Sequence, residues 1–149
     1  MRLALFQPDI PQNVGACIRL SACFGVELHV VEPTGFHFDD RAMKRAALDY
    51  GPLSHMTRHA DWDGFQRNRP AGRLILFTTR GATPLSDFVF HPDDTLLFGK
   101  ETSGAPDYVH AAVDARVVIP LRPEARSLNL SVTAGVALWE GLRQTGGIG

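Results

Sequence analysis

The sequence predicts an α/β fold, with a mostly parallel sheet and helices on both of its faces. Short apolar runs alternate along the chain with segments of helical periodicity, and several runs are apolar at every position. Continuous apolar runs are typical of strands buried on both faces of a parallel sheet. Ligands of such folds bind beyond the carboxyl ends of the strands, so the polar residues that follow each run are the candidates for function.

The strand predictions follow the apolar runs in order. The first run ends at Pro8, and a later run ends at Gly99, residues that are typical of turns. Strands are predicted at residues 3–6, 28–31, 73–79, 95–98 and 116–121, with a shorter candidate at 53–57 and a turn-rich stretch at 81–94.

Helices are predicted from apolar periodicity and from residues that suit helix ends. Asn13 is a good N-cap for the first helix, and Gly25 suits its C-terminus. Asp39 or Asp40 caps the second helix, and Pro106 suits the first position of a later one. Helices are predicted at residues 14–24, 41–48, 61–67, 106–112 and 132–143, and residues 145–149 are expected to form a frayed tail.

Length and charge bound the possible functions. The 149 residues fit a single domain, residues 1–149. A formal net charge of −1 gives no global attraction to nucleic acid, so any RNA contact needs local groups such as Arg41, Lys44 and Arg45, which share a predicted helix face. The first apolar run is too short for a signal peptide and no window suits a membrane span. We therefore expect a cytoplasmic protein with no membrane partner.

Several familiar site types are disfavoured. Cys17 and Cys23 lie on different faces of one predicted helix and form no Cys-x-x-Cys pattern. Among the six histidines only His55 and His59 have a ligand-like spacing, and they lack a third ligand, so no metal is expected. The chain has no Gly-x-Gly-x-x-Gly or P-loop pattern, which disfavours the common nucleotide-binding folds.

Three polar clusters stand at predicted strand or helix ends. The first spans residues 11–15 and includes Asn13, with Arg19 six residues further on. A helix cap followed by a surface arginine explains this pattern without any function. Alternatively, the helix start and Arg19, expected on one side of the helix, hold a phosphate or a ribose together.

The other two clusters follow predicted strands. In residues 98–106, glycines flank Glu101, which is compatible with a solvated turn or with a loop that approaches a ligand closely. In residues 127–131, Ser127 is a candidate N-cap, but one cap needs only one polar residue, and Asn129 and Ser131 follow. That surplus indicates a polar pocket. No histidine stands in any of the three clusters, which argues against a Ser-His-Asp hydrolase.

In this order, the three clusters resemble the three motifs of the SPOUT superfamily of RNA methyltransferases, in its SpoU branch and the small single-domain group called TrmL or YibK. Segments 32–36, 48–50 and 78–81 between the motifs are also similar, so the resemblance covers nearly the whole chain. The matching motifs are Pro11-Gln12-Asn13-Val14-Gly15 with Arg19, Phe98-Gly99-Lys100-Glu101-Thr102-Ser103-Gly104, and Ile119-Pro120 with Arg126-Ser127-Leu128-Asn129-Leu130-Ser131.

The resemblance implies a C-terminal deep trefoil knot and a homodimer in which the partner completes each site. It implies S-adenosylmethionine as the cofactor, with S-adenosylhomocysteine as its product, and no metal. The substrate would be tRNA, methylated on the ribose 2′-OH of the wobble nucleotide 34, a cytidine or uridine, with leucine tRNA favoured. The cofactor-binding residues implied are Phe77, Thr78, Thr79, Gly99, Glu101, Gly104, Ile119, Leu121, Ser127 and Leu128.

By the same resemblance, the catalytic residues are Arg19, Asn13, Glu101, Ser127 and Asn129. A ribose hydroxyl is hardly ionised at neutral pH, and a free arginine, with a pKa of about 12.5–13.8, is a poor base. We therefore expect Arg19 to stabilise the developing alkoxide while the proton leaves through a phosphate. Asn13, Glu101, Ser127 and Asn129 would orient the substrate, the cofactor and Arg19.

Two positions depart from the family pattern. Lys100 stands where the family has a proline and Ser103 where it has an arginine, so Lys100 is expected to supply a charge that Ser103 lacks. Two alternatives stay open: a SpoU-type 2′-O-methyltransferase acting on rRNA or another tRNA position, and a non-catalytic RNA-binding relative. Enzymes of the first kind often carry an extra RNA-binding domain, and its absence from these 149 residues favours the minimal tRNA group. The retained site residues argue against the second alternative.

Overall fold

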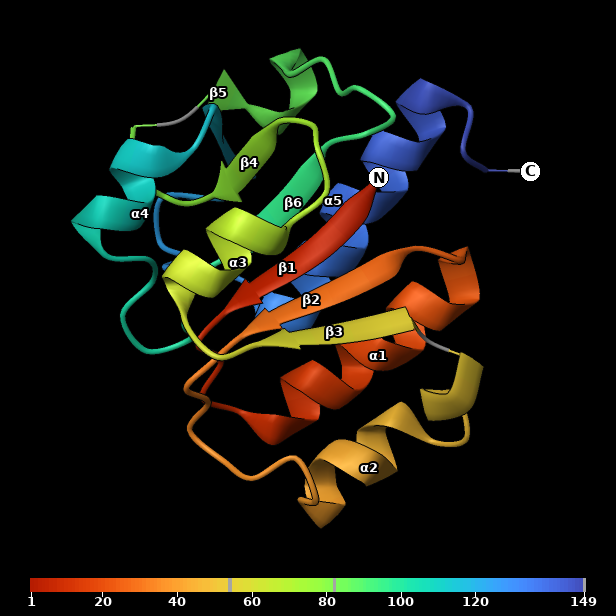
Figure 1. The fold of residues 1–149 in the computed structure, drawn as a ribbon. Helices are drawn as coiled ribbons and strands as arrows, with labels where there is room; N and C mark the ends of the chain where they lie inside the picture. Colours follow the sequence, from red (N-terminus) through yellow and green to blue (C-terminus); the bar gives the residue numbers. More distant parts are fainter. Residues whose placement is uncertain (54, 82, 149) are drawn as a thin grey trace.

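A computed structural model describes residues 1–53, 55–81 and 83–148. Within this part of the chain, seven strands form one sheet in the order β3-β2-β1-β6-β4-β7-β5, and every pair of neighbours is parallel (Figure 1). The strands are β1 Arg2–Phe6, β2 Glu27–Val31, β3 His55–His59, β4 Leu74–Phe77, β5 Thr83–Pro84, β6 Thr95–Phe98 and β7 Ala115–Val118. The predicted α/β class with a parallel sheet is confirmed.

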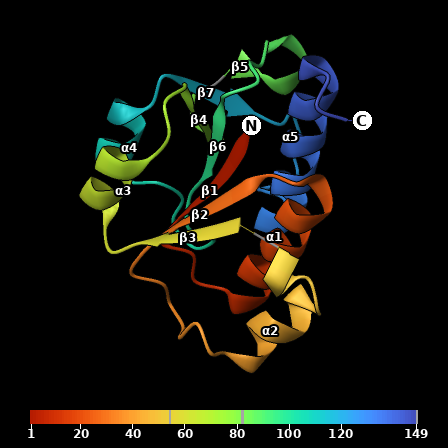
Figure 2. The same cartoon turned by 45° about the vertical axis from the view of Figure 1, so that its right-hand side comes forward.

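Helices cover both faces of the sheet, as predicted (Figures 1 and 2). Helices α1 Pro11–Phe24, α2 Arg41–Ala47 and α5 Leu130–Thr145 lie on one face, and α3 Trp62–Asn68 and α4 Asp107–Ala112 lie on the other. Short 3₁₀ turns are found at Gly51–Leu53 and Leu85–Asp87. The trefoil knot stays a prediction, because strand order and register do not by themselves decide how the chain threads.

Alternate residues of the central strands feed two separate cores. In β1, Leu3 and Leu5 belong to the core under α1 and α5, whereas Ala4 and Phe6 belong to the core under α3 and α4. This alternation follows from the two-residue period of a strand, and it explains why the runs are apolar throughout.

Three predicted strands differ from the observed ones by two residues or more at one end or both. The candidate at 53–57 lies at β3 instead, and β4 and β7 stop at Phe77 and Val118. Residues 78, 79 and 119–121 were predicted as strand because they follow directly on strongly apolar runs. Of these, Thr78, Thr79, Ile119 and Leu121 line a cavity instead. The turn-rich stretch contains the two-residue β5, which pairs with Val117 and Val118.

The first helix cap was predicted wrongly. The N-cap of α1 is Ile10, not Asn13, and the helix begins at Pro11, a residue whose missing N–H suits the first turn. The Asn13 side chain is free of capping because it is bound to side chains from two other segments. Gly25 has the left-handed conformation expected at this helix end, with φ 64°.

The later helix ends correct several other predictions. Asp40 caps α2, and Asn129, not Ser127, caps α5 by accepting hydrogen bonds from the N–H groups of Ser131 and Val132. Pro106 is the N-cap of α4 and not its first residue. Helix α5 extends through Thr145, so the frayed tail does not begin there, and residue 149 lies outside the described residues.

Candidate active site

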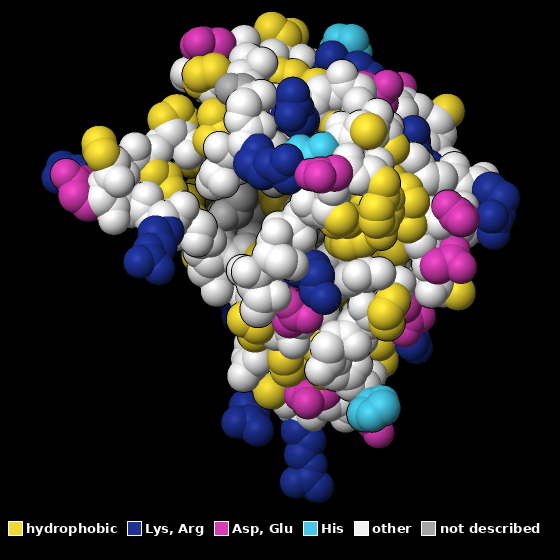
Figure 3. Space-filling view, turned by 90° about the vertical axis from the view of Figure 1, so that its left-hand side faces the viewer, with side chains coloured by type: hydrophobic (Ala, Val, Ile, Leu, Met, Phe, Trp, Pro, Cys, Tyr) yellow, Lys and Arg dark blue, Asp and Glu magenta, His cyan; other side chains and the backbone are white. Residues whose placement is uncertain are grey.

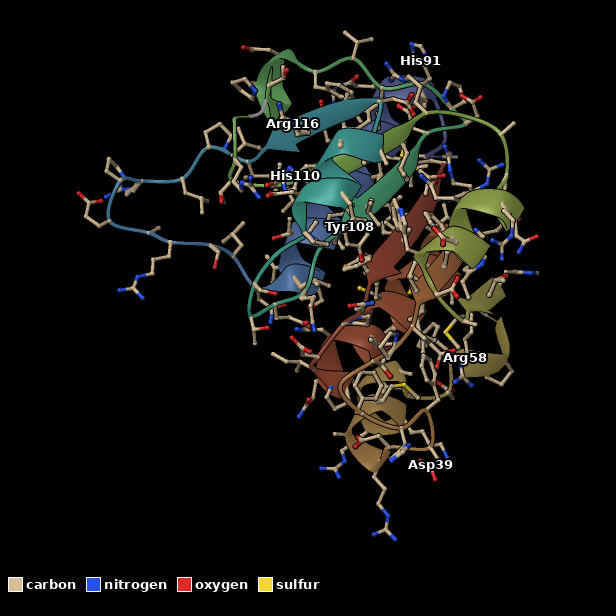
Figure 4. All side chains as sticks on the ribbon, turned by 60° about the vertical axis from the view of Figure 1, so that its left-hand side comes forward. Asp39, Arg58, His91, Tyr108, His110 and Arg116 are labelled. Atoms are coloured by element: carbon tan, nitrogen blue, oxygen red, sulfur yellow. The ribbon has the colours of Figure 1, made fainter. Side chains whose placement is uncertain are left out.

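A cavity of about 490 Å³ lies at the carboxyl ends of β4, β6 and β7. Figure 3 shows this hollowed face, with dark-blue Lys and Arg side chains on several sides of the hollow, and Figure 4 shows the segment between β7 and α5 projecting from the body beside it. The volume is within the range of small-molecule sites, about 300–1,000 Å³. The predicted cofactor-binding residues line this cavity without exception: Phe77, Thr78, Thr79, Gly99, Glu101, Gly104, Ile119, Leu121, Ser127 and Leu128.

Side chains from the three sequence clusters meet directly at one wall of the cavity. Asn13 donates from Nδ2 to Oε1 of Glu101 at 3.1 Å, and Asn129 donates from Nδ2 to Oδ1 of Asn13 at 3.0 Å. Asn13 is buried, which makes these partners necessary. Asn13 and Asn129, 116 positions apart along the chain, are therefore joined directly by one hydrogen bond, and Asn13 links Asn129 to Glu101 by a second.

The Glu101 carboxylate is also held by the backbone before α1. The N–H of Asp9 donates to Oε2 at 2.7 Å, and the N–H of Ile10 donates to Oε1 at 3.2 Å. Asp9 in turn accepts a bond of 2.7 Å from the Thr102 hydroxyl, and its Oδ1 lies 3.5 Å from Nζ of Lys100. These contacts fix the carboxylate in one orientation and use both of its oxygens.

The loop that carries Glu101 is closed tightly on itself. Lys100 and Gly104 exchange backbone hydrogen bonds of 3.2 and 2.9 Å. A Cβ at position 99 would lie 2.5 Å from backbone atoms of Gly104 and Ala105, so glycine is required there. Glycine is thus required by a close approach within the loop itself, because the strand exit turns back on the chain, and the close approach to a ligand stays a prediction.

Sequence reasoning assigned no role to several polar residues of the cavity wall, among them Arg80 and His110. Arg80 lies 2.9 Å from the exposed Asp107 at the start of α4. Burial lowers the pKa of His110, and the nearby guanidinium groups of Arg80 and Arg116 lower it further. Figure 4 shows His110 and Arg116 close to each other on α4 and β7. A histidine within a predicted helix gave no local signal for this position.

Arg19 is the one predicted catalytic residue that does not line the cavity. It is exposed on α1, with its guanidinium carbon 5.4 Å from the centre of the Tyr50 ring. The expectation that Arg19 and Asn13 share a side of the helix is wrong within one chain. Six residues advance a helix by about 600°, which leaves the two side chains roughly 120° apart.

Another titratable cluster lies apart from these loops. Among the described residues, His91, Asp93 and Asp94 offer ligand atoms within 4.8 Å of one another. The buried Asp94 carboxylate is already engaged, however, because it forms two hydrogen bonds with the Arg73 guanidinium at 2.8 and 2.7 Å. The expectation that the protein uses no metal stays a prediction.

The cavity wall suits a ligand with an apolar ring and a polar tail. Phe77, Ile119 and Leu121 supply apolar surface, while the loop at Gly99 brings backbone polar groups close. The fixed Glu101 carboxylate adds a negative charge, which suits a cationic ligand. Among the described residues, no helix is long and apolar enough to cross a membrane.

Comparisons with known proteins agree with this geometry. The model of the SpoU rRNA methylase family matches residues 1–139. A tRNA (cytidine(34)-2'-O)-methyltransferase from Beijerinckia indica is 49% identical over 148 residues, covering 98% of this chain and 92% of its own length. A solved structure described in terms of 2-OH methylation of C/U34 on tRNA is 40% identical, with a TM-score of 0.92, covering 96% of this chain and 94% of that one. An AdoMet-bound rRNA methyltransferase from Sinorhizobium meliloti is 27% identical, with a TM-score of 0.85, covering 95% of this chain and 55% of that one.

Proposed function

The chain belongs to the SpoU rRNA methylase family, and from that membership we propose that it methylates the ribose 2′-OH of nucleotide 34, a cytidine or uridine, in tRNA. The observation that carries this proposal is the joining of Asn13, Glu101 and Asn129 by hydrogen bonds beside one cavity. The relative from Beijerinckia indica is similar over nearly its whole length, which includes the residues of that cavity.

S-adenosylmethionine is the methyl donor that the cavity fits. The apolar walls at Phe77, Ile119 and Leu121 would hold the adenine, and the loops at Thr78 and Gly99 would bind its polar edges. When bound, the cofactor supplies an electrophilic methyl carbon on a sulfonium. The AdoMet carried by the Sinorhizobium meliloti methyltransferase supports this assignment.

The protein's own contribution is positioning and charge. The 2′-oxygen would receive the methyl group of the bound cofactor, which would leave as S-adenosylhomocysteine, while the hydroxyl proton would leave through a phosphate. Arg19 would stabilise the negative charge that develops on the oxygen. The network around Glu101 would fix the cavity wall against which the ribose is placed.

A homodimer would bring Arg19 to the cavity of a second chain. Exposed apolar side chains at Val132, Val136 and Trp139, each 42–50% exposed, form one stripe along α5. Trp139 also packs edge-to-face on Phe24 of α1, with ring centroids 6.0 Å apart. The stripe therefore reaches the C-terminal end of the helix that carries Arg19, and a second copy seated on it would lie against that helix.

The tRNA backbone would contact the exposed face of α2. Arg41, Lys44 and Arg45 are exposed and form no ion pair with any residue that the structure describes. Helix α2 packs extensively against α1, so these cations lie on the same part of the molecule as Arg19. Such a local cluster suits phosphate even though the net charge is −1. The cytoplasmic location expected from the sequence goes with this substrate.

Mapping of ribose methylation by mass spectrometry tests the proposal. Unmodified leucine tRNA, other tRNAs and rRNA fragments are incubated with the protein and S-adenosylmethionine, with calorimetry of cofactor binding in parallel. A new 2′-O-methyl group at nucleotide 34 is expected, and it should be absent without cofactor. Methylation confined to rRNA or to another tRNA position would replace the proposed substrate. RNA binding without any binding of S-adenosylmethionine and without methylation would identify a non-catalytic relative.

A further inference from the structure

On the basis of the function proposed above, we propose that Tyr50 is a positioning residue that holds the Arg19 guanidinium ready for the ribose. Tyr50 lies outside the cavity, and nothing in the chemistry of methyl transfer calls for its hydroxyl. Its ring nevertheless faces the guanidinium of the one predicted catalytic residue that the cavity lacks, with 5.4 Å between the Arg19 guanidinium carbon and the ring centre.

The contact is of a kind that orients a cation without neutralising it. A guanidinium within about 6 Å of an aromatic ring centre is attracted to the ring's negative face. Among the described residues, Arg19 forms no ion pair with a carboxylate. A carboxylate would compete with the oxygen that Arg19 is expected to stabilise, whereas the uncharged Tyr50 ring leaves the full positive charge available.

The backbone brings Tyr50 to this place at a cost. Leu48, just after α2, has φ 54° and ψ −134°, a conformation that residues with a Cβ rarely adopt. Its side chain is 55% exposed, so burial of that side chain does not compensate for the strain. The chain turns there, and the Tyr50 N–H bonds to the Ala47 carbonyl at 3.2 Å. Strained backbone of this kind clusters at functional sites, which favours a role for the contact that Tyr50 makes.

The other half of the contact is fixed by the packing of α1 on α2. A Cβ at Gly15 would lie 2.2 Å from the Met43 carbonyl oxygen and 2.8 Å from Cβ of Ala46, so only glycine permits this close approach. Arg19 follows Gly15 by four residues, one turn along the same helix. The tight contact at Gly15 therefore sets the height of Arg19 above the end of α2, where Tyr50 lies.

The test compares Tyr50→Phe, which keeps the ring, with Tyr50→Leu, which removes it. Wild-type tRNA methylation is measured first, then kcat, KM for tRNA and calorimetric cofactor affinity for each variant. Tyr50→Phe should keep kcat within about twofold, and Tyr50→Leu should lower kcat roughly tenfold with unchanged cofactor affinity and melting temperature. In an Arg19→Ala background, Tyr50→Leu should have no further effect, because both changes remove one interaction.

Three results would overturn the proposal: wild-type kcat in Tyr50→Leu, a Tyr50→Leu effect confined to KM, or an equal loss in the Arg19→Ala background. The latter two would make Tyr50 an RNA contact that acts independently of Arg19. The contact is also measured without activity, by the NMR mobility of the Arg19 Nε–H group. That group should be ordered in wild type and Tyr50→Phe and mobile in Tyr50→Leu, even if tRNA proves not to be the substrate.

Discussion

The candidate site residues differ between the two halves of the sheet: near the cavity they are bonded to one another, and on α1 and α2 they are exposed and unpaired with any described carboxylate. At the carboxyl ends of β4, β6 and β7, the polar groups around Glu101 are tied to one another by hydrogen bonds. On α1 and α2, by contrast, Arg19 and the cations of α2 are exposed and have no carboxylate partner among the described residues. One chain thus builds the proposed cofactor pocket alone and leaves its cations available to a polyanion and a second chain.

The largest predicted effect is that of Arg19→Ala on the rate of methylation. Loss of a group that stabilises developing charge lowers a rate by about 10²–10³-fold. The affinity for S-adenosylmethionine should stay unchanged, because Arg19 does not line the cavity of its own chain. Single-turnover methylation and calorimetry measure the two effects separately. A variant with the full rate would remove Arg19 from the mechanism.

Mixing two variants that are each expected to have little activity, Arg19→Ala and Asn129→Ala, tests whether the site is shared between chains. Arg19→Ala keeps an intact cavity, and Asn129→Ala keeps an intact Arg19. If Arg19 acts in the partner's cavity, mixed dimers contain one intact site, and activity should return when the two proteins are exchanged. Trp139→Glu, which places a charge on the α5 stripe, should prevent this recovery by separating the chains. No recovery from dimers shown to be mixed would mean that Arg19 acts within its own chain.

The next prediction concerns the free energy of unfolding and tests the hydrogen-bonded network around Glu101. Glu101→Ala leaves the N–H groups of Asp9 and Ile10 and the Asn13 amide without their acceptor, which should cost about 2–3 kcal/mol of unfolding free energy in urea. The matched control, Glu124→Ala at an exposed position in the loop before α5, should change it by less than about 0.5 kcal/mol. Equal values for the two variants would show that the network contributes nothing to the fold.

A smaller effect, on tRNA affinity, is expected from the exposed cations of α2. Replacing Arg41, Lys44 and Arg45 together by alanine should weaken tRNA binding and flatten its salt dependence by roughly one unit of slope for each phosphate that the variant no longer neutralises. Arg143→Ala is the control, since Arg143 is exposed but paired with Glu140 on its own helix at 2.8 Å. Salt titrations of tRNA affinity give both slopes. Identical slopes would place the RNA on another face.

Sequence patterns predicted the features that depend on neighbouring residues in the chain. The buried strands were found because both faces of the sheet are covered. The cap of α2 was narrowed to Asp39 or Asp40 because a cap acts on its own helix, and the structure selects Asp40. Asn13 was misassigned because its partners, Glu101 and Asn129, lie far away in sequence. The two-residue β5 was missed because so short a strand has no periodicity. The separation of Arg19 from the cavity was missed although helix geometry alone indicates it.

The predicted cofactor-binding residues show a second limit of prediction from sequence patterns. Thr78, Thr79, Ile119 and Leu121 follow directly after apolar strands, and only their position at the sheet edge makes them cavity walls. Family resemblance identified them, whereas periodicity assigned them to strands. His29 and His59 gave no signal for a related reason. They lie on neighbouring strands, and His29 is in register with Thr57, so the two histidines meet only diagonally.

That histidine pair gives the smallest predicted effect, in the half of the sheet away from the cavity. Nδ1 of His29 lies 3.0 Å from Nε2 of His59, and both rings are buried. Burial lowers the pKa of His29 below 6.5 despite Glu27, whose Oε2 is 3.5 Å from its Nε2. Burial, and then the His29 ring, lower the pKa of His59. The pair is therefore neutral in the folded protein at pH 7.

A lowered histidine pKa means that the unfolded chain binds protons first as the pH falls. Stability from this pair is complete above about pH 6.5 and declines as the pH drops below that value toward the lowered folded pKa values. Between pH 7.5 and 5.5, wild type should lose on the order of 1 kcal/mol more unfolding free energy than His59→Phe. Replacing the exposed His37 by glutamine should leave the wild-type slope unchanged. Parallel curves for wild type and His59→Phe would mean that the rings accept a proton without cost, which two stacked, buried imidazoles in direct contact should not do.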